Sequence, residues 1–340
     1  MKLLVTLKPE GYEKPTASYG VVAEIDWERR CVLRQLRLPS ASFRCGEAFM
    51  APLIGGLCLT GHRLFVAMWN HIVEIDYPSF EVVNAFSTPQ MGDLHGLTTD
   101  GTTLWVTATA TEMVLGFDLN TMELIWQWGA DAPILASYPQ LYRPPRWRQN
   151  WRKRLAYHLQ GGPQHPPLAA GEHRHRHKSC SPTYHHHLND VTYHKGKLYV
   201  TTSGWYGSQN PGAVIELDPN SHAAHFVAPP GSFDGTHDTV FVDDTLFVTE
   251  SRRNSLAWLN SDGRTGRHTL QPSPYFVRGL CWSNHLFIVG YTRMRGTQDP
   301  ALLVAFNRHF APMGQMALDQ FHPPALGSAI HAVIPVPETL

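Results

Sequence analysis

The 340-residue sequence predicts an all-β fold, specifically a six-bladed β-propeller. Three observations support this prediction: a turn-rich composition, a repeat close to 40 residues long, and two chain ends whose strands complement each other. Charged residues make up only 16% of the chain, which contains 27 glycines and 26 prolines. Such a composition favours many turns and few solvated helices.

The repeat consists of a short apolar strand, a polar turn and a second strand of the form Leu-aromatic-Val. Its five copies read GGLCLTGHRLFVA from Gly55, HGLTTDGTTLWVT from His95, NDVTYHKGKLYVT from Asn189, HDTVFVDDTLFVT from His237 and RGLCWSNHLFIVG from Arg278. A third strand follows in HIVEIDY from His71, MVLGFDL from Met113, AVIELDP from Ala213 and SLAWLNS from Ser255. Alternating apolar and polar residues indicate half-buried strands, and a period near 40 residues indicates stacked units.

The two ends of the chain complete a sixth unit. Residues 330–336 supply a first strand, residues 2–7 match the Leu-aromatic-Val strand, and residues 21–26 match the third strand. We therefore expect one propeller domain over residues 1–340, closed by a blade that both termini share, because ring closure removes open sheet edges. A β-sandwich leaves the complementary ends unexplained, and a helical solenoid lacks the required i, i+3, i+4, i+7 spacing.

One insertion, residues 131–186, separates the second and third units. Its stretch 143–154 holds six basic residues and no acidic one, interleaved with Trp147 and Trp151, and a histidine-rich tract follows. We expect the insertion to cover one mouth of the propeller or to dock a protein partner, since long loops in compact domains often carry function. With 28 basic and 28 acidic residues the net charge is zero, which disfavours nucleic acid.

The sequence also bears on compartment. No apolar run approaches the roughly 18 residues that a spanning helix needs, and the first eight residues are too short for a secretory leader. The five cysteines are odd in number and form no CxxC pair, which argues against a disulfide framework and a cysteine-based zinc site. We expect a soluble protein of the cytoplasm, without a membrane span.

In a propeller the first strand of each blade lines the central channel, so equivalent positions form a ring. Alignment on the Leu-aromatic-Val strands predicts a ring made of Gly55, His95, Asn189, His237, Arg278 and His331. Histidine occupies blades 2, 4 and 6, about 120° apart in a six-bladed ring. Three imidazoles with an open fourth position suit catalytic zinc. We expect one divalent metal, with zinc first and iron or copper as alternatives; the competing interpretation is three histidines hydrogen-bonded in a wet channel.

The stretches LHGLTTDGTTLWVT, HDTVFVDDTLFVTESRRN, FVRGLCWSNHLFIVG and AIHAV resemble the catalytic domain of peptidyl-α-hydroxyglycine α-amidating lyases, within the wider NHL and gluconolactonase-like propellers. The resemblance implies a six-bladed propeller with zinc on His95, His237 and His331. It implies Tyr206 as a base near the metal and Arg252 or Arg253 as a holder of the substrate carboxylate. The sequence departs from the family after the second strand of blade 1, where residues 67–71 hold no arginine.

Three functions stay open at this point. The first is a metal-dependent lyase or hydrolase that acts on a small-molecule or peptide-derived substrate, in which Arg278 neutralises a carboxylate or oxyanion and Asn189 and His187 contact the substrate. The second places redox-active iron or copper on the same histidines. The third is a non-enzymatic scaffold that binds a protein through residues 143–154.

The sequence also predicts a structural role for two aspartates next to the ring. Asp190 and Asp238 each follow a ring residue by one position, so strand alternation would turn them away from the axis. We expect them to tie neighbouring blades together through backbone hydrogen bonds.

Overall fold

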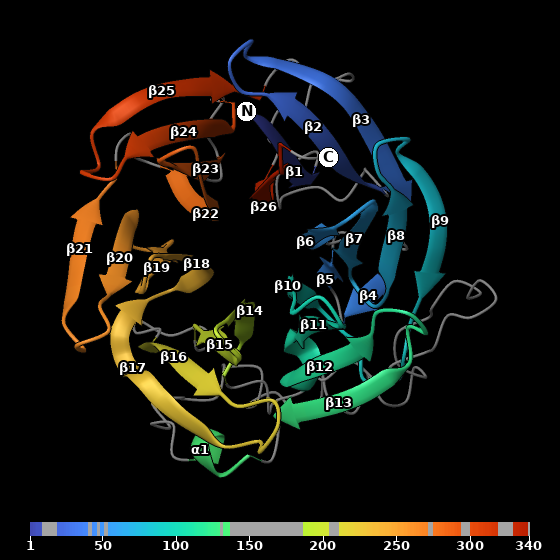
Figure 1. The fold of residues 1–340 in the computed structure, drawn as a ribbon, viewed down its shortest axis with the longest axis vertical. Coiled ribbons are helices and arrows are strands. Elements are labelled where there is room, and N and C mark those ends of the chain that lie inside the picture. The colour runs from blue at the N-terminus through green and yellow to red at the C-terminus, as the bar shows by residue number, and fades with distance from the viewer. Residues whose placement is uncertain are drawn as a thin grey trace.

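The fold is that of a computed structural model, which describes residues 1–8, 19–39, 43–45, 48–50, 54–129, 132–136, 186–203, 211–270, 275–293, 300–318 and 329–338. Six four-stranded antiparallel sheets stand around a common axis, each with one edge toward the centre (Figure 1). The predicted six-bladed β-propeller is therefore confirmed.

The blades follow one another along the chain, each running from its innermost to its outermost strand. Blade 1 contains β6 (Ile54–Thr60), β7 (Arg63–Met68), β8 (Ile72–Asp76) and β9 (Glu81–Phe86). Blade 2 contains β10 (Leu94–Thr99), β11 (Thr103–Ala108), β12 (Met113–Asp118) and β13 (Leu124–Gly129). Blade 3 contains β14 (Leu188–His194), β15 (Lys197–Thr202), β16 (Pro211–Leu217) and β17 (Ala224–Asp234).

The remaining blades repeat this order. Blade 4 contains β18 (Thr236–Val242), β19 (Thr245–Glu250), β20 (Ser255–Leu259) and β21 (Thr265–Thr269). Blade 5 contains β22 (Tyr275–Ser283), β23 (Leu286–Arg293), β24 (Leu302–Asn307) and β25 (Pro312–Ala317). Blade 6 contains β26 (Ala329–Pro335), β1 (Lys2–Lys8), β2 (Tyr19–Asp26) and β3 (Cys31–Pro39).

Short elements lie outside the blades. A small hairpin joins β4 (Phe43–Cys45) to β5 (Ala48–Met50), and a 3-10 turn covers Thr109–Thr111. The helix α1 (Pro133–Ala136) has four residues. Within the described ranges no helix has the length and apolar character needed to cross a membrane.

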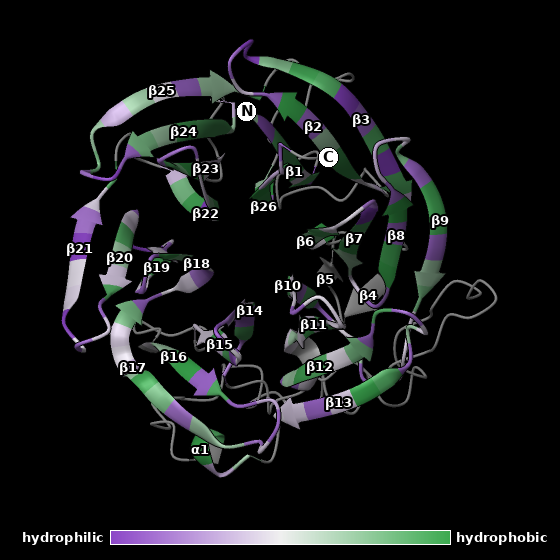
Figure 2. Cartoon of the chain, viewed as in Figure 1, coloured by the Kyte–Doolittle hydropathy of each residue, from purple (hydrophilic) through white to green (hydrophobic). Residues whose placement is uncertain are grey.

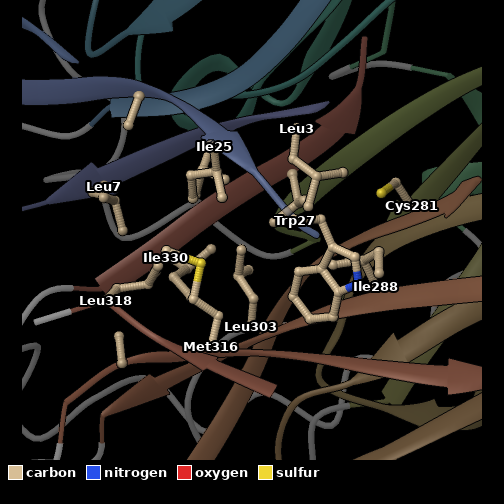
Figure 3. Close-up of a cluster of buried hydrophobic side chains, with 14 of the residues drawn as sticks. Leu3, Leu7, Ile25, Trp27, Cys281, Ile288, Leu303, Met316, Leu318 and Ile330 are labelled. Atoms are coloured by element: carbon tan, nitrogen blue, oxygen red, sulfur yellow. The ribbon is translucent and has the colours of Figure 1, made fainter. Parts of the chain in front are cut away.

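The two termini close the ring as the sequence predicted. The C-terminal β26 forms the inner edge of blade 6 and pairs antiparallel with the N-terminal β1, for example Leu4 with Ile334 and Val5 with Val333. Side chains of blade 6 then pack against blade 5. Leu3 and Ile330 of blade 6 and Leu303 of blade 5 are all fully buried in this contact (Figure 3). Pairing and packing together bind residues more than 320 positions apart in the sequence.

Hydropathy follows the distance from the axis within each blade. The middle strands are largely apolar, whereas the outermost strands carry many polar residues (Figure 2). In blade 1, β8 is buried at four of its five residues while β9 is exposed along most of its length. Burial between blades is the main stabilising contribution, because burying apolar surface is worth about 25 cal/mol per Å².

Every innermost strand carries an irregularity at its ring residue. In β10, Leu94 pairs with Ala108 and Leu97 pairs with Val106, so His95 and Gly96 together face Thr107. The other five innermost strands shift register at the equivalent place. A bulge bends a strand and re-aims its side chains, which turns the ring residues toward the axis.

Candidate functional site

The ring surrounds a cavity of about 280 Å³ on the propeller axis. All six predicted ring residues line it, one from each blade: Gly55, His95, Asn189, His237, Arg278 and His331. Beyond the ring, the side chains two positions further along the strands are mostly apolar, as at Leu97, Val191 and Leu280. The tier beyond the ring is therefore a mostly apolar wall, which Thr239 interrupts.

The register of Arg278 follows from strand pairing. Arg278 precedes Leu286 by eight residues, whereas His237 precedes Leu246 by nine. In the sheet, however, Phe287 pairs with Trp282 as Leu246 pairs with Phe241, each four positions beyond the ring residue. Counted to Phe287 the offset is again nine, and Arg278 belongs in the ring.

Two of the ring histidines are held in the same way. Nδ1 of His95 lies 2.9 Å from the carbonyl oxygen of Asp93 and 2.9 Å from Oγ1 of Thr109. Nδ1 of His237 lies 3.0 Å from the carbonyl oxygen of Gly235 and 2.7 Å from Oγ of Ser251. The partner carbonyl is two residues before each histidine, and the partner hydroxyl is fourteen residues after it.

These contacts fix the tautomer of both rings. The Thr109 hydroxyl donates its hydrogen to the carbonyl of Leu188, and the Ser251 hydroxyl donates to the carbonyl of Val277. A hydroxyl has one hydrogen, so each can only accept from Nδ1, as the backbone carbonyls must. Nδ1 therefore carries the proton, and Nε2 of His95 and of His237 keeps its lone pair.

His331 has a different neighbour. By strand pairing, Lys8 of β1 occupies the place that Thr109 and Ser251 occupy in their blades. Lys8 is buried, and its charge helps to lower the pKa of His331. Nε2 of His331 is buried and has no hydrogen-bond partner within the described part of the chain.

The charge of Arg278 acts on all three ring histidines. Burial, followed by the charge of Arg278, lowers the pKa of His95 to about 3 and the pKa values of His237 and His331 well below their usual range. The imidazoles are therefore neutral at pH 7. Arg278 is itself buried, and no carboxylate oxygen of the described residues lies within ion-pair distance of its guanidinium.

The two residues predicted to bind substrate are both buried near the ring. Asn189 donates from Nδ2 to the carbonyl of Thr236, while its Oδ1 is buried without a hydrogen-bond partner among the described residues. His187 lies two residues before Asn189, with its ring centre 5.4 Å from that of His95. Burial, and then the charge of His95, lowers the pKa of His187 to about 3.

The two aspartates join neighbouring blades as expected. Asp190 Oδ2 accepts hydrogen bonds of 2.8 Å from both N and Oγ1 of Thr239, and Asp238 Oδ2 accepts one of 2.7 Å from the backbone N of Gly279. Both residues also belong to the lining of the cavity. The bulge at each ring residue interrupts the strand alternation from which their direction was predicted.

The other predicted residues lie elsewhere. Arg252 and Arg253 follow β19 and extend toward Asp234 at 4.0 and 3.6 Å, and neither lines the cavity. Tyr206 and the basic stretch 143–154 lie outside the described residues, as does most of the insertion 131–186.

The sequence reasoning missed Thr109 and Ser251. Both end a recurring pattern, Leu-aromatic-Val-Thr-x-Ser/Thr, which reads LWVTAT in blade 2, LYVTTS in blade 3 and LFVTES in blade 4. The constant spacing of fourteen residues from each histidine would have been the signal.

The donor chemistry fits a divalent transition metal. Two histidines offer an unprotonated Nε2 held by a bond at Nδ1, which is how metal-binding histidines are usually oriented, and the third offers a buried Nε2 without a partner. As the side chains stand, no three His, Cys, Asp or Glu side chains among the described residues are positioned to hold one ion. To hold one ion, these side chains would have to move closer together, although the strands already bring all three histidines to one cavity.

Comparison with known proteins shows the fold alone. The sequence matches no protein-family model and no curated protein. A crystal structure of a protein of unknown function from Bacteroides caccae is similar at a TM-score of 0.60 and 11% identity, over 99% of both chains. A structure of a nidogen/laminin complex is similar at a TM-score of 0.58 and 8% identity, over 98% of this chain and 97% of that chain.

Proposed function

We propose that the protein is a metal-dependent lyase or hydrolase whose metal, zinc first, is held by His95, His237 and His331 on the propeller axis. The observation that carries the proposal is that two of these imidazole rings make the same pair of hydrogen bonds at Nδ1. Blades 2 and 4 each use a backbone carbonyl and a Thr or Ser hydroxyl to keep Nδ1 protonated and Nε2 basic.

Packing alone does not require this arrangement. A histidine that only filled the channel would not need two acceptors at Nδ1, and the buried Nε2 of His331 lacks a hydrogen-bond partner among the described residues, which is costly unless a ligand supplies one. Neutral imidazoles with lowered pKa values remain available as ligands at pH 7. The resemblance to amidating lyases, which bind zinc through three histidines on alternate blades, supports the same assignment.

When bound, such a metal would supply Lewis-acid polarisation of a carbonyl or hydroxyl oxygen, or a water of lowered pKa. Arg278 would hold the negative charge of a substrate, because its guanidinium is buried and lies beyond ion-pair distance of every described carboxylate, although the charge of Asp238 still acts on it. Asn189 would accept a hydrogen bond from the substrate at Oδ1, which is otherwise unsatisfied. The apolar wall beyond the ring would exclude water from the reacting atoms.

The experiment is metal analysis of protein purified without a histidine tag, in the wild type and in His237→Ala. We expect about one metal ion per chain in the wild type and a loss of most of it in the variant. His268→Ala is the matched control, because His268 lies on the outermost strand β21 and stacks on Phe310 far from the ring. A wild-type protein without stoichiometric metal would refute the proposal.

The element found decides between two chemistries. Zinc supports the lyase or hydrolase, whereas iron or copper with oxygen consumption supports an oxidoreductase on the same histidines, since imidazole suits all three metals.

A further inference from the structure

The position two residues before a ring residue lies near the start of the innermost strand, and we call it the wall position. On two blades an aromatic side chain at this wall position packs edge-on against the ring histidine of the preceding blade. The ring centres of His187 and His95 are 5.4 Å apart at an angle of 69°, and those of Phe276 and His237 are 5.1 Å apart at 78°. The two contacts are equivalent, and Phe276 demonstrates that a carbon ring suffices for packing.

His187 adds to this packing two nitrogen atoms next to the proposed metal site. Its side chain is buried. Blade 3, which carries His187, lies between blade 2 with His95 and blade 4 with His237 (Figure 1).

The backbone that carries His187 is firmly anchored. The preceding residue, His186, donates its backbone N–H to Oε1 of Glu112 at 2.7 Å, and its ring Nδ1 lies 3.1 Å from Oε2 of the same carboxylate. On its other side, Ser203 donates its backbone N–H to the carbonyl of His187 at 3.2 Å. These bonds fix where the backbone presents the His187 side chain.

We propose that His187 is a fourth metal ligand, which shares the axial metal with His95. Two imidazoles bound to one zinc at about 2.0–2.1 Å and near the tetrahedral angle place their ring centres about 5 Å apart, close to the 5.4 Å observed. The inference rests on the proposed function, because it requires a metal at the axis. It extends the predicted ligand set to a fourth blade.

The test is a cobalt(II) titration of the metal-free, tag-free protein, followed by visible absorption and by competition with a chelator. The variant His187→Phe gives blade 3 the side chain that blade 5 already has, so packing is kept while the nitrogens are lost. We expect it to bind cobalt on the order of 10- to 100-fold more weakly, with altered absorption bands. His187→Gln should weaken cobalt binding to a similar extent. This second variant replaces the first in the test if the phenylalanine variant misfolds.

His268→Phe is the matched control, because it makes the same replacement on the outermost strand β21, far from the ring; its cobalt affinity should equal that of the wild type. If the wild type binds cobalt and both His187 variants bind it equally well with unchanged spectra, the inference is overturned and the three-histidine site stands. If the wild type binds no cobalt, both the proposed function and the inference about His187 fail.

Discussion

Oγ of Ser251 lies 2.7 Å from Nδ1 of His237 and donates its own hydrogen to the carbonyl of Val277 in the next blade. One hydroxyl therefore sets the tautomer of a ring histidine and joins blades 4 and 5. Thr109 does the same for His95 between blades 2 and 3. Because the same relation occurs twice, orientation of Nε2 is coupled to closure of the propeller.

Replacement of Ser251 by alanine should affect both roles. We expect metal affinity to fall about tenfold, since His237 loses one of two groups that orient it, and the free energy of unfolding to fall by about 1 kcal/mol as the Val277 carbonyl loses its donor. Ser255→Ala is the control: Ser255 is also buried in blade 4 but bonds to Glu250. It should cost similar stability and leave the cobalt titration unchanged; equal effects of the two variants on affinity would argue against an orienting role.

Arg278→Met should strengthen metal binding. The charge of Arg278 lowers the pKa of each of the three ring histidines, so it opposes any positive charge that these rings hold. Its removal should raise cobalt affinity roughly tenfold, since a unit charge several ångströms away is worth one or two kcal/mol at an intermediate dielectric. Chelator competition measures the change, with Arg308→Gln, whose partner Asp243 is exposed, as the control. An unchanged or weakened affinity would place the metal away from Arg278.

Asp190 should make stability depend on pH. Burial, and then the charge of Asp238, raises the pKa of Asp190 to about 7 from 3.8. A carboxyl with a raised pKa contributes stability that is full below about pH 4 and is lost as the pH rises through about 7, with a slope of at most about 1.4 kcal/mol per pH unit.

Denaturant unfolding of the wild type and of Asp190→Asn across this range measures the effect. The asparagine does not titrate, so the wild type should lose stability relative to the variant as the pH rises. A difference that is constant with pH would show that Asp190 titrates normally.

Two thiols should resist modification. Burial raises the pKa values of Cys58 and Cys281 to about 12, and a thiolate is the reactive form. At pH 8 we expect iodoacetamide to leave both unlabelled in the folded protein and to label them after denaturation, while the half-buried Cys31 reacts first. Peptide mass spectrometry identifies the sites; rapid labelling of Cys281, which lines the cavity, would indicate an open channel.

Much of the fold was accessible from sequence because each blade repeats one local pattern. The spacing from His95 to Leu104 and from His237 to Leu246 was enough to place both on one ring. The blade shared by residues 2–7 and 330–336 was predicted because strand-forming ends without partners must pair.

Other features depended on three-dimensional irregularities. The direction of the Asp190 and Asp238 side chains could not be derived from a period of two, because a bulge at each ring residue breaks that period. The wall contact between His187 and His95 joins two blades, and no spacing within one blade encodes it.

The most direct test is anomalous X-ray scattering at the zinc, iron and copper edges from crystals of the native, tag-free protein. The proposed site predicts a peak in the axial cavity at about 2.0–2.1 Å from Nε2 of His95 and of His237. A cavity without an anomalous peak at any of the three edges, in protein never exposed to chelator, would contradict a metal centre on these histidines.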